Sequence, residues 1–435
     1  MFGATGGLND SPACKLCCEA AIALKIPVFV PNLYPFYSVP DGFCEVAPAA
    51  GDELEILSDG AELRATADRT VDILSFAGDF IFPTPPKVGR RTRLSLSGLV
   101  LDGRGVPEQW SETDYGILRR VGAVNSSAEH FEMRHCKIRN FYGHGVRAIG
   151  TQSSTIEHCS AENVGGHWYA YDTYDAFGDA FYHAYAQDGA EIRIQHSPMT
   201  GYPEKYSRAG CVFEFSSARY EAIIEDSPIV GYERSVHVEE QGSKISLRIH
   251  RSHMSRTRVG LFILGDEMSD ARVELVDTYI DYADGDYGGQ SLVSNQSSAA
   301  LAIERVAMRA TKQPFLARFG PRTTLRDCII DWNGLPGAIE LSSISAVRTT
   351  FRGIRANGSA HTSRVALRAI ECRFEGDPGA LFLDSADGAN WVAENSFSSG
   401  PVVRANIGPE WRGQYGTLPI RAPIDPLARS VAAES

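Results

Sequence analysis

The sequence predicts an all-β protein, built as a single right-handed parallel β-helix with a short helical cap at its N-terminus. Three observations lead to this prediction. A short motif recurs about every 22 residues, apolar residues keep fixed positions around it, and only one stretch has a helical pattern. A composition of 43% hydrophobic and 22% charged residues supplies enough apolar material for a folded core.

The helical stretch is "PACKLCCEAAIALK", residues 12–25, with Asp10 and Ser11 as candidate caps. Its "CKLCC" run loosely resembles a metal or redox cluster, but packing on a helix explains it as well. The nine cysteines show no paired CxxC motifs and no Cys/His metal spacing. We therefore expect no metal and no other cofactor.

Ten short runs make up the repeat, and the second residue of each is small. These residues are Cys136, Cys159, Ser197, Ser227, Ser252, Thr278, Val306, Cys328, Thr350 and Cys372. An apolar residue usually stands three positions earlier, as at Met133, and another two positions later, as at Ile138. Coils stacked at about 4.8 Å bring like residues into internal columns, and small residues fit where a coil turns a tight corner. Most cysteines are therefore predicted to be structural.

Each coil is predicted to have a second strand after a turn that contains glycine, such as "GVRAIG", "DAFYHAYAQ" and "GCVFEFSS". Helical repeats fit less well, because the coils are too short and too rich in Ser, Thr, Val and Gly. We expect the cap and first strands over residues 1–60, the β-helix over 61–405 and a C-terminal extension over 406–435. The longest intervals between motifs fall between residues 159 and 227 and predict loops on a binding face.

The N-terminus resembles a known family. "FGATG" at residues 2–6, "ND" at 9–10, the helix and then "IPVFVPNLYPFYSV" are similar to the opening motif of pectate-lyase-superfamily (pectin-lyase-like) proteins, which include bacteriophage tailspikes and other polysaccharide-acting enzymes. The resemblance implies that the helix shields the open end of the solenoid. It also implies a polysaccharide depolymerase of tailspike type, a homotrimer, and an extracellular or virion location.

Charge and hydropathy narrow the choice of partner. A net charge of −12 without long basic runs argues against nucleic acid, and no stretch approaches the roughly 18 apolar residues of a membrane span. The first residues lack the basic and apolar regions of a secretion signal. A polysaccharide is the partner that we expect.

The candidate catalytic residues are carboxylates on second strands of consecutive coils: Glu214, Glu239 and Asp266, with Asp179 opening the first of these strands. Outward carboxylates stand about 5 Å apart on adjacent coils and about 10 Å apart one coil further on, which spans the separations of retaining (about 5–5.5 Å) and inverting (about 6.5–9.5 Å) glycosidases. The sequence thus predicts an endo-acting glycoside hydrolase with paired carboxylates. The alternative for each acid is a solvated surface position without a catalytic role.

Aromatic and histidine side chains near these acids are the candidate sugar-binding residues: Trp168, Tyr169, Tyr171, Tyr174, Tyr182, His183, Tyr185 and His237. Sugar rings stack their C–H faces on aromatic rings. An inward Tyr182 would turn His183 and Tyr185 outward, and an inward Phe215 would turn Glu214 outward. The loop over residues 165–179 has an alternative role as a hydrophobic plug on a neighbouring coil or subunit.

Two other functions stay open. A polysaccharide lyase would abstract a proton beside a uronate carboxylate, with a base such as His183 or Tyr182 and a cation such as Arg256 or Arg258. A non-catalytic carbohydrate-binding solenoid would keep the aromatic residues without needing the acid pair. The unequal coil lengths argue against a purely structural scaffold.

Overall fold

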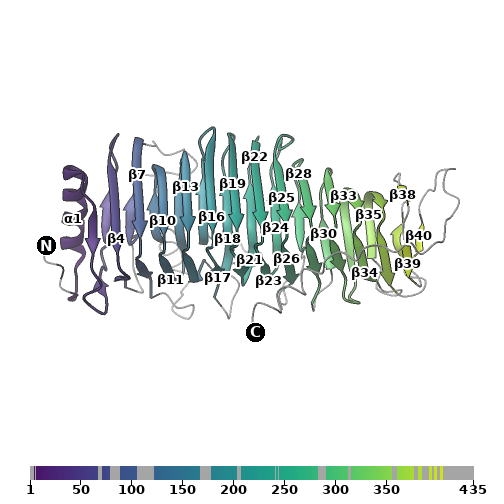
Figure 1. Cartoon of the computed structure of the whole chain (residues 1–435), viewed down its shortest axis with the longest axis horizontal. Helices are drawn as coiled ribbons and strands as arrows, with labels where there is room; N and C mark the ends of the chain where they lie inside the picture. The colour runs from purple at the N-terminus through teal and green to yellow at the C-terminus, as the bar shows by residue number, and fades with distance from the viewer. Residues whose placement is uncertain are drawn as a thin grey trace, which may run out of the picture. The chain divides into compact units, whose positions relative to one another are not determined.

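The computed structural model describes residues 4, 6–66, 71–78, 89–104, 122–166, 178–202, 207–240, 242, 244–282, 291–311, 315–354, 360–376, 381–384, 391–393, 396–398 and 402–404. The chain divides into two compact units, Met1–Glu240 and Gln241–Ser435. Each unit is a parallel β-helix, and the first also carries the helix α1 (Ser11–Leu24) (Figure 1). The predicted C-terminal extension, residues 406–435, lies outside the described residues.

In the first unit each full coil contributes one strand to each of three parallel stacks. The first stack holds β1 (Val28–Val30), β4 (Glu53–Ser58), β7 (Gly89–Ser97), β10 (Ala128–Arg134), β13 (Ser153–Glu157), β16 (Ala190–Gln195) and β19 (Arg219–Glu225). The second holds β3 (Cys44–Val46), β6 (Leu74–Phe76), β9 (Gly122–Ser126), β12 (His144–Ile149), β15 (Asp179–Ala184), β18 (Ser207–Glu214) and β21 (Tyr232–Glu239). The third holds β2 (Tyr37–Ser38), β5 (Glu62–Arg64), β8 (Val100–Asp102), β11 (Lys137–Phe141), β14 (Ser160–Val164), β17 (Met199–Thr200) and β20 (Ile229–Val230).

The second unit repeats this plan. One stack holds β22 (Lys244–His250), β25 (Arg272–Val276), β28 (Ala300–Glu304), β31 (Thr323–Arg326), β33 (Gly337–Val347), β35 (Ala360–Ile370) and β38 (Trp391–Ala393). Another holds β24 (Val259–Leu264), β27 (Val293–Asn295) and β30 (Phe315–Arg318), and β30 also pairs with the long β33. The third holds β23 (Met254–Thr257), β26 (Tyr279–Tyr282), β29 (Ala307–Arg309), β32 (Ile329–Asp331), β34 (Thr350–Ile354), β36 (Arg373–Gly376) and β39 (Ser396–Ser398), and β37 (Leu381–Asp384) pairs with β40 (Val402–Arg404).

The core consists of columns of apolar side chains, as the repeat predicts. One column in the first unit runs through Ile56, Leu96, Met133, Ile156, Ile194 and Ile224, all paired in register and all buried. A matching column in the second unit runs through Ile249, Leu275, Ile303, Leu325, Ala346 and Ala369. Like residues at like positions in every coil therefore bury the inner face of each stack.

The column of small residues lies at the corner between two stacks. The backbone N–H of Cys136 donates to Cys159 Sγ at 3.4 Å, that of Cys159 to Ser197 Oγ at 3.2 Å, and that of Ser197 to Ser227 Oγ at 3.0 Å. The residue before each small one has a positive φ, for example 52° at His135, and this turns the chain sharply. The corner divides the first predicted segment of each coil in two, so a coil has three strands where the sequence predicted two.

One repeat was aligned wrongly by one residue. The repeat predicts Thr350 as the small corner residue, but Thr349 is fully buried at the corner and follows Arg348, whose φ is 48°. Thr350 opens β34 and pairs with Ile329. Two consecutive threonines leave the choice open in the sequence, and the turn of the backbone decides it.

Helix α1 lies against β1, β3 and β4 at the N-terminal end of the first unit (Figure 1). Cys14 and Cys18 are buried and free, which agrees with a packing role. Asp10 is the N-cap residue, yet its side chain caps no helical N–H; Oδ2 instead accepts the N–H of Ser38 at 3.2 Å. Through this hydrogen bond Asp10 links the start of the helix to β2. None of the described helices is long and apolar enough to cross a membrane.

Candidate active site

The candidate site lies on the outer side of β15, β18 and β21, three adjacent strands of the second stack. Glu214 ends β18 and pairs in register with Glu239, which ends β21. The inward positions before them, Phe213 and Val238, are fully buried. The Glu214 side chain is only 5% exposed, whereas that of Glu239 is 42% exposed. The predicted pair of outward acids on adjacent coils is thus formed with one buried and one open member.

His237 bridges the two acids. Its Nε2 lies 3.0 Å from Glu239 Oε2, and its Nδ1 lies 3.2 Å from Arg234 Nη1 and 3.8 Å from Glu214 Oε1. Burial holds the pKa of His237 well below its ordinary value, against the opposing charge of Glu214. A guanidinium can only donate, so Nδ1 of the neutral ring accepts from Arg234 and Nε2–H donates to Glu239.

Arg208 holds the buried acids. Its Nη1 donates to Asp179 Oδ1 at 2.7 Å and its Nη2 to Glu214 Oε1 at 3.2 Å. All three side chains are almost completely buried. One guanidinium thus compensates two carboxylates, the arrangement that buried charges require.

Asp179 is the most deeply buried member of this set. Its backbone N–H donates to His144 Nδ1 at 3.4 Å, and its Oδ2 has no hydrogen-bond partner among the described residues. Burial raises the pKa of Asp179 to about 6, although the charge of Arg208 opposes the shift. Burial likewise keeps the pKa of His144 well below its ordinary value. Asp179 therefore accepts a hydrogen bond from Arg208 in the protein interior and does not face solvent.

Aromatic rings flank the acids. Tyr182 packs beside Ala184 and Val212 on the outer side, and its ring lies 5.3 Å from that of His144. Tyr185 stacks on Phe215 with ring centroids 5.7 Å apart. Both Tyr185 and Phe215 have positive φ values, 54° and 58°, which are unusual for bulky side chains. The two residues directly follow the ends of β15 and β18, next to Glu214, where the positive φ turns the chain out of each strand.

Three predicted orientations are wrong, those of Tyr182, His183 and Phe215. His183 points into the helix, where it stacks on Phe213 and its Nε2 lies 2.9 Å from Ser154 Oγ, so Tyr182 faces outward in its place. Phe215 is 36% exposed and does not face inward. Every residue of β15 is buried, so both faces of the strand are covered. The pattern of polar and apolar residues therefore does not indicate which side chains point inward.

The other predicted residues belong to the second unit or lie outside the described residues. Asp266 is exposed in a bend after β24 and belongs to the second unit. The aromatic residues Trp168, Tyr169, Tyr171 and Tyr174 fall within residues 167–177, which lie outside the described residues. Their role in sugar binding stays a prediction.

Among the described residues, Glu214, His237 and Glu239 form a set that could hold a cation, since one ligand atom from each lies within 4.8 Å of the others. Arg208 and Arg234 already supply positive charge at hydrogen-bonding distance from Glu214 and His237. Because one carboxylate oxygen from each glutamate belongs to this set, the nearest oxygens of Glu214 and Glu239 lie within 4.8 Å of each other.

The sequence analysis missed Arg208, Arg234 and His144. Arg208 and Arg234 lie on the strands of the predicted acids, in "SRAGCVFE" and "YERSVHVE". An arginine six residues before an outward acid is a weak signal in a sequence. It gains meaning only when the coils stack and bring Asp179 to the same guanidinium.

No protein-family model and no curated protein matches this chain. Two solved structures are similar to it. The A-module of mannuronan C-5 epimerase AlgE6 from Azotobacter vinelandii is 12% identical, with 91% of this chain and 98% of that chain covered and a TM-score of 0.34. The surface adhesin PfbA of Streptococcus pneumoniae is 11% identical, with 93% of this chain and 94% of that chain covered and a TM-score of 0.38.

Proposed function

We propose that this protein hydrolyses a polysaccharide, with Glu214 and Glu239 as its pair of catalytic carboxylates. The observation that carries the proposal is their pairing in register on adjacent coils, with nearest oxygens within 4.8 Å. Glycosidases that retain stereochemistry hold their two carboxyl groups roughly 5–5.5 Å apart. A retaining mechanism therefore fits better than an inverting one.

The different surroundings of the two acids assign their roles. Arg208 donates a hydrogen bond to Glu214 and holds its carboxyl group in place, and Glu214 acts as the nucleophile on the anomeric carbon. Glu239 is open to solvent and held by His237, and it protonates the leaving glycosidic oxygen. Glu239 then takes a proton from the water that releases the sugar from Glu214. Tyr185 and Phe215 offer a stacked aromatic surface beside the pair for sugar rings.

The uronate lyase has weaker support. His183 points into the helix, so it does not face a substrate on the outer side. Burial raises the pKa of Tyr182 well above its ordinary value, which disfavours the phenolate form of this base. Arg208 and Arg234 already bond protein groups.

The test is cleavage of a panel of bacterial surface and capsular polysaccharides, with the products read by mass spectrometry. We expect Glu239→Gln to lower the rate about 10²–10⁴-fold, the usual contribution of an acid–base group, and Glu214→Gln, which removes the nucleophile, to lower it at least as much. Glu191→Gln, on the exposed edge of β16, is the matched control and should cleave at the wild-type rate. Cleavage by both site variants at the wild-type rate, or binding without cleavage by the wild-type chain, contradicts the proposal.

A further inference from the structure

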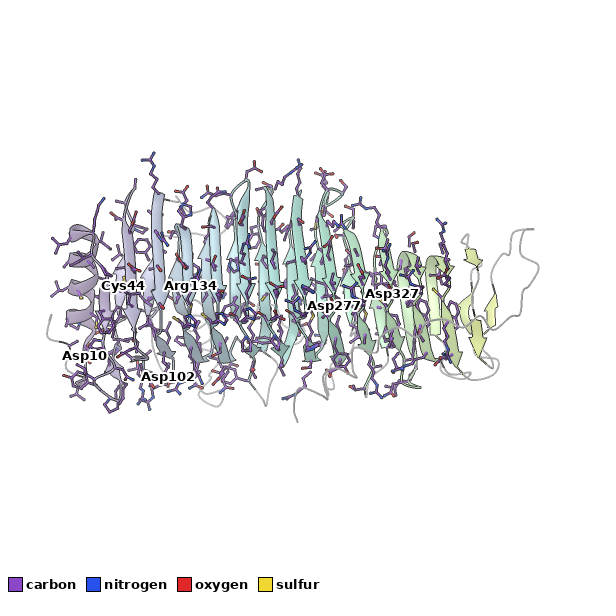
Figure 2. All side chains as sticks on the ribbon, viewed as in Figure 1. Asp10, Cys44, Asp102, Arg134, Asp277 and Asp327 are labelled. Atoms are coloured by element: carbon purple, nitrogen blue, oxygen red, sulfur yellow. The ribbon has the colours of Figure 1, made fainter. Side chains whose placement is uncertain are left out.

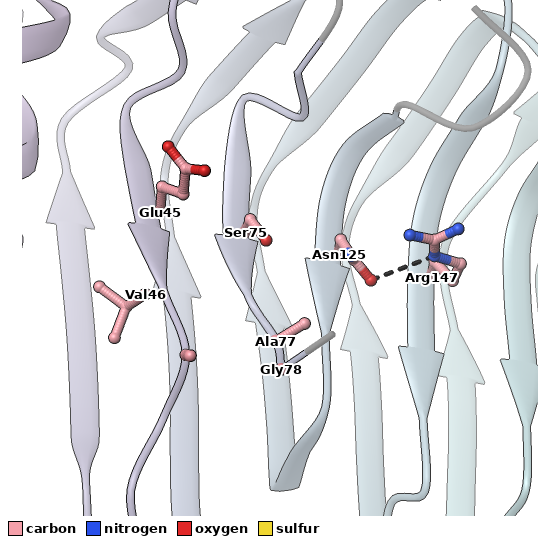
Figure 3. A pocket seen from close by; sticks show the side chains of 8 residues that line it. Glu45, Val46, Ser75, Ala77, Gly78, Asn125 and Arg147 are labelled. Atoms are coloured by element: carbon pink, nitrogen blue, oxygen red, sulfur yellow. Dashed lines mark hydrogen bonds between the residues drawn. The ribbon is translucent and has the colours of Figure 1, made fainter. Parts of the chain in front are cut away.

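A second polar site lies on the N-terminal side of the candidate active site. It is a pocket of about 290 Å³ on the outer side of the second stack. Its polar side chains come from four successive strands, β3, β6, β9 and β12, as Figure 3 shows: Glu45, Ser75, Asn125 and Arg147. This volume is close to the lower end of the range for ligand pockets, roughly 300–1,000 Å³, and suits a small unit such as one sugar ring.

The pocket and the candidate active site share one row of the stack. Glu45, Ser75, Asn125 and Arg147 are paired in register, and the same row continues through Tyr182, Val212 and His237. Three coils separate Arg147 from His237, or about 14 Å at roughly 4.8 Å per coil. Tyr182, Val212 and His237 are buried, so an extended glycan that reaches both places passes over the side chains that cover this part of the row.

The pocket has an available positive charge. Arg147 Nε donates to Asn125 Oδ1 at 3.1 Å, and Arg147 forms no ion pair with any carboxylate in the described ranges. The carboxylate of Glu45, by contrast, binds Lys15 Nζ at 2.7 Å. A guanidinium has five N–H donors in a planar fork, and its remaining donors match a carboxylate or sulfate group. The charge of Arg147 also acts on the buried His144, which lies next to Asp179.

We propose that this pocket is a subsite for an anionic sugar unit, held through its acidic group by Arg147 and through its hydroxyls by Asn125 and Ser75. This inference rests on the proposed function, because it makes the substrate an acidic polysaccharide. It adds that recognition of the acidic group takes place about three coils from the cleaved bond. The carboxylate of a uronic acid and a sulfate ester share the required chemistry.

The test measures binding by calorimetry in a Glu239→Gln background, so that the glycan stays intact. The probes are a hexasaccharide of a uronic-acid homopolymer, the same hexasaccharide after reduction of its carboxyl groups, and a sulfated neutral hexasaccharide. We expect Arg147→Gln to weaken binding of the preferred anionic probe about tenfold or more, the value of one charge-assisted hydrogen bond. Binding of the reduced probe should not change, and the better anionic probe identifies the acidic group.

Two controls separate charge from fold. Arg193→Gln removes a half-exposed arginine of β16 that pairs with Glu191, and it should leave all affinities unchanged. Arg147→Lys keeps the charge and should keep a preference for the anionic probe. Equal weakening of both uronic probes, no effect of Arg147→Gln, or no preference of the parent chain for either anionic probe overturns the inference. Charge-dependent binding without any cleavage by the wild-type chain instead overturns only the proposed hydrolysis.

Discussion

The outer sides of β15, β18 and β21 in the first unit carry two glutamates, a histidine and two arginines in one bonded network. The corresponding outward row on β24, β27 and β30 of the second unit holds Phe262, Ser294 and Arg318. The inward positions next to these rows include buried apolar residues in both units, such as Val236 and Val293. The coil plan therefore fixes where side chains stand, and among the described residues these two outward rows differ in the polar groups that they present.

The same contrast holds for single carboxylates. Asp179 in the first unit is fully buried, and burial raises its pKa to about 6. Asp277 in the second unit stands at a corner on the surface, labelled in Figure 2, where hydrogen bonds from Arg305 lower its pKa. A buried acid and a surface acid that both bond arginine should thus respond to pH in opposite directions.

The largest effect is expected from Arg208→Ala. It leaves Asp179 and Glu214 buried without their shared countercharge, which should lower the free energy of unfolding by about 3–5 kcal/mol. Arg318→Ala in the second unit is the matched control, and a surface change of this kind stays within about 0.5 kcal/mol. Urea unfolding of both variants measures the difference. Equal, small losses would mean that the buried network contributes nothing to stability.

An intermediate effect is expected from Asp179→Asn. The pKa of Asp179 is about 6 in the folded chain and 3.8 for the ordinary group, so the folded state keeps a proton that the unfolded state has lost. Its stabilising contribution is complete below pH 3.8 and is lost as the pH rises to 6, on the order of 3 kcal/mol in total. Unfolding curves between pH 4 and 7 should show this component in the wild type and not in the variant. The same pH slope in both proteins contradicts the assignment to Asp179.

The smallest effect is expected from Asp277→Asn. Arg305 and His250 hold the ionised form of Asp277, whose contribution is present above its ordinary pKa of 3.8 and is lost as the pH falls through the lowered value. Because both partners are partly exposed, the contribution should be about 1 kcal/mol or less. Unfolding at pH 2 to 5 measures it. A loss of stability on raising the pH would reverse the predicted sign.

The repeat could be predicted from the sequence because stacking demands the same residue type at the same place in every coil. Met133, Ile156, Ile194 and Ile224 show this in the core, and Glu214 and Glu239 show it on the outer side. The orientation of His183 could not be predicted, because both faces of β15 are buried and its side chains do not alternate in polarity. The role of Arg208 was equally hidden, since its two acidic partners come from different coils.

The most direct measurement is digestion of a cleavable polysaccharide in water enriched in ¹⁸O, with mass spectrometry of the products. Hydrolysis at Glu214 and Glu239 predicts one ¹⁸O atom at each new reducing end, and no label without both acids. Unsaturated products that carry no ¹⁸O, formed by the wild-type chain, would contradict the account.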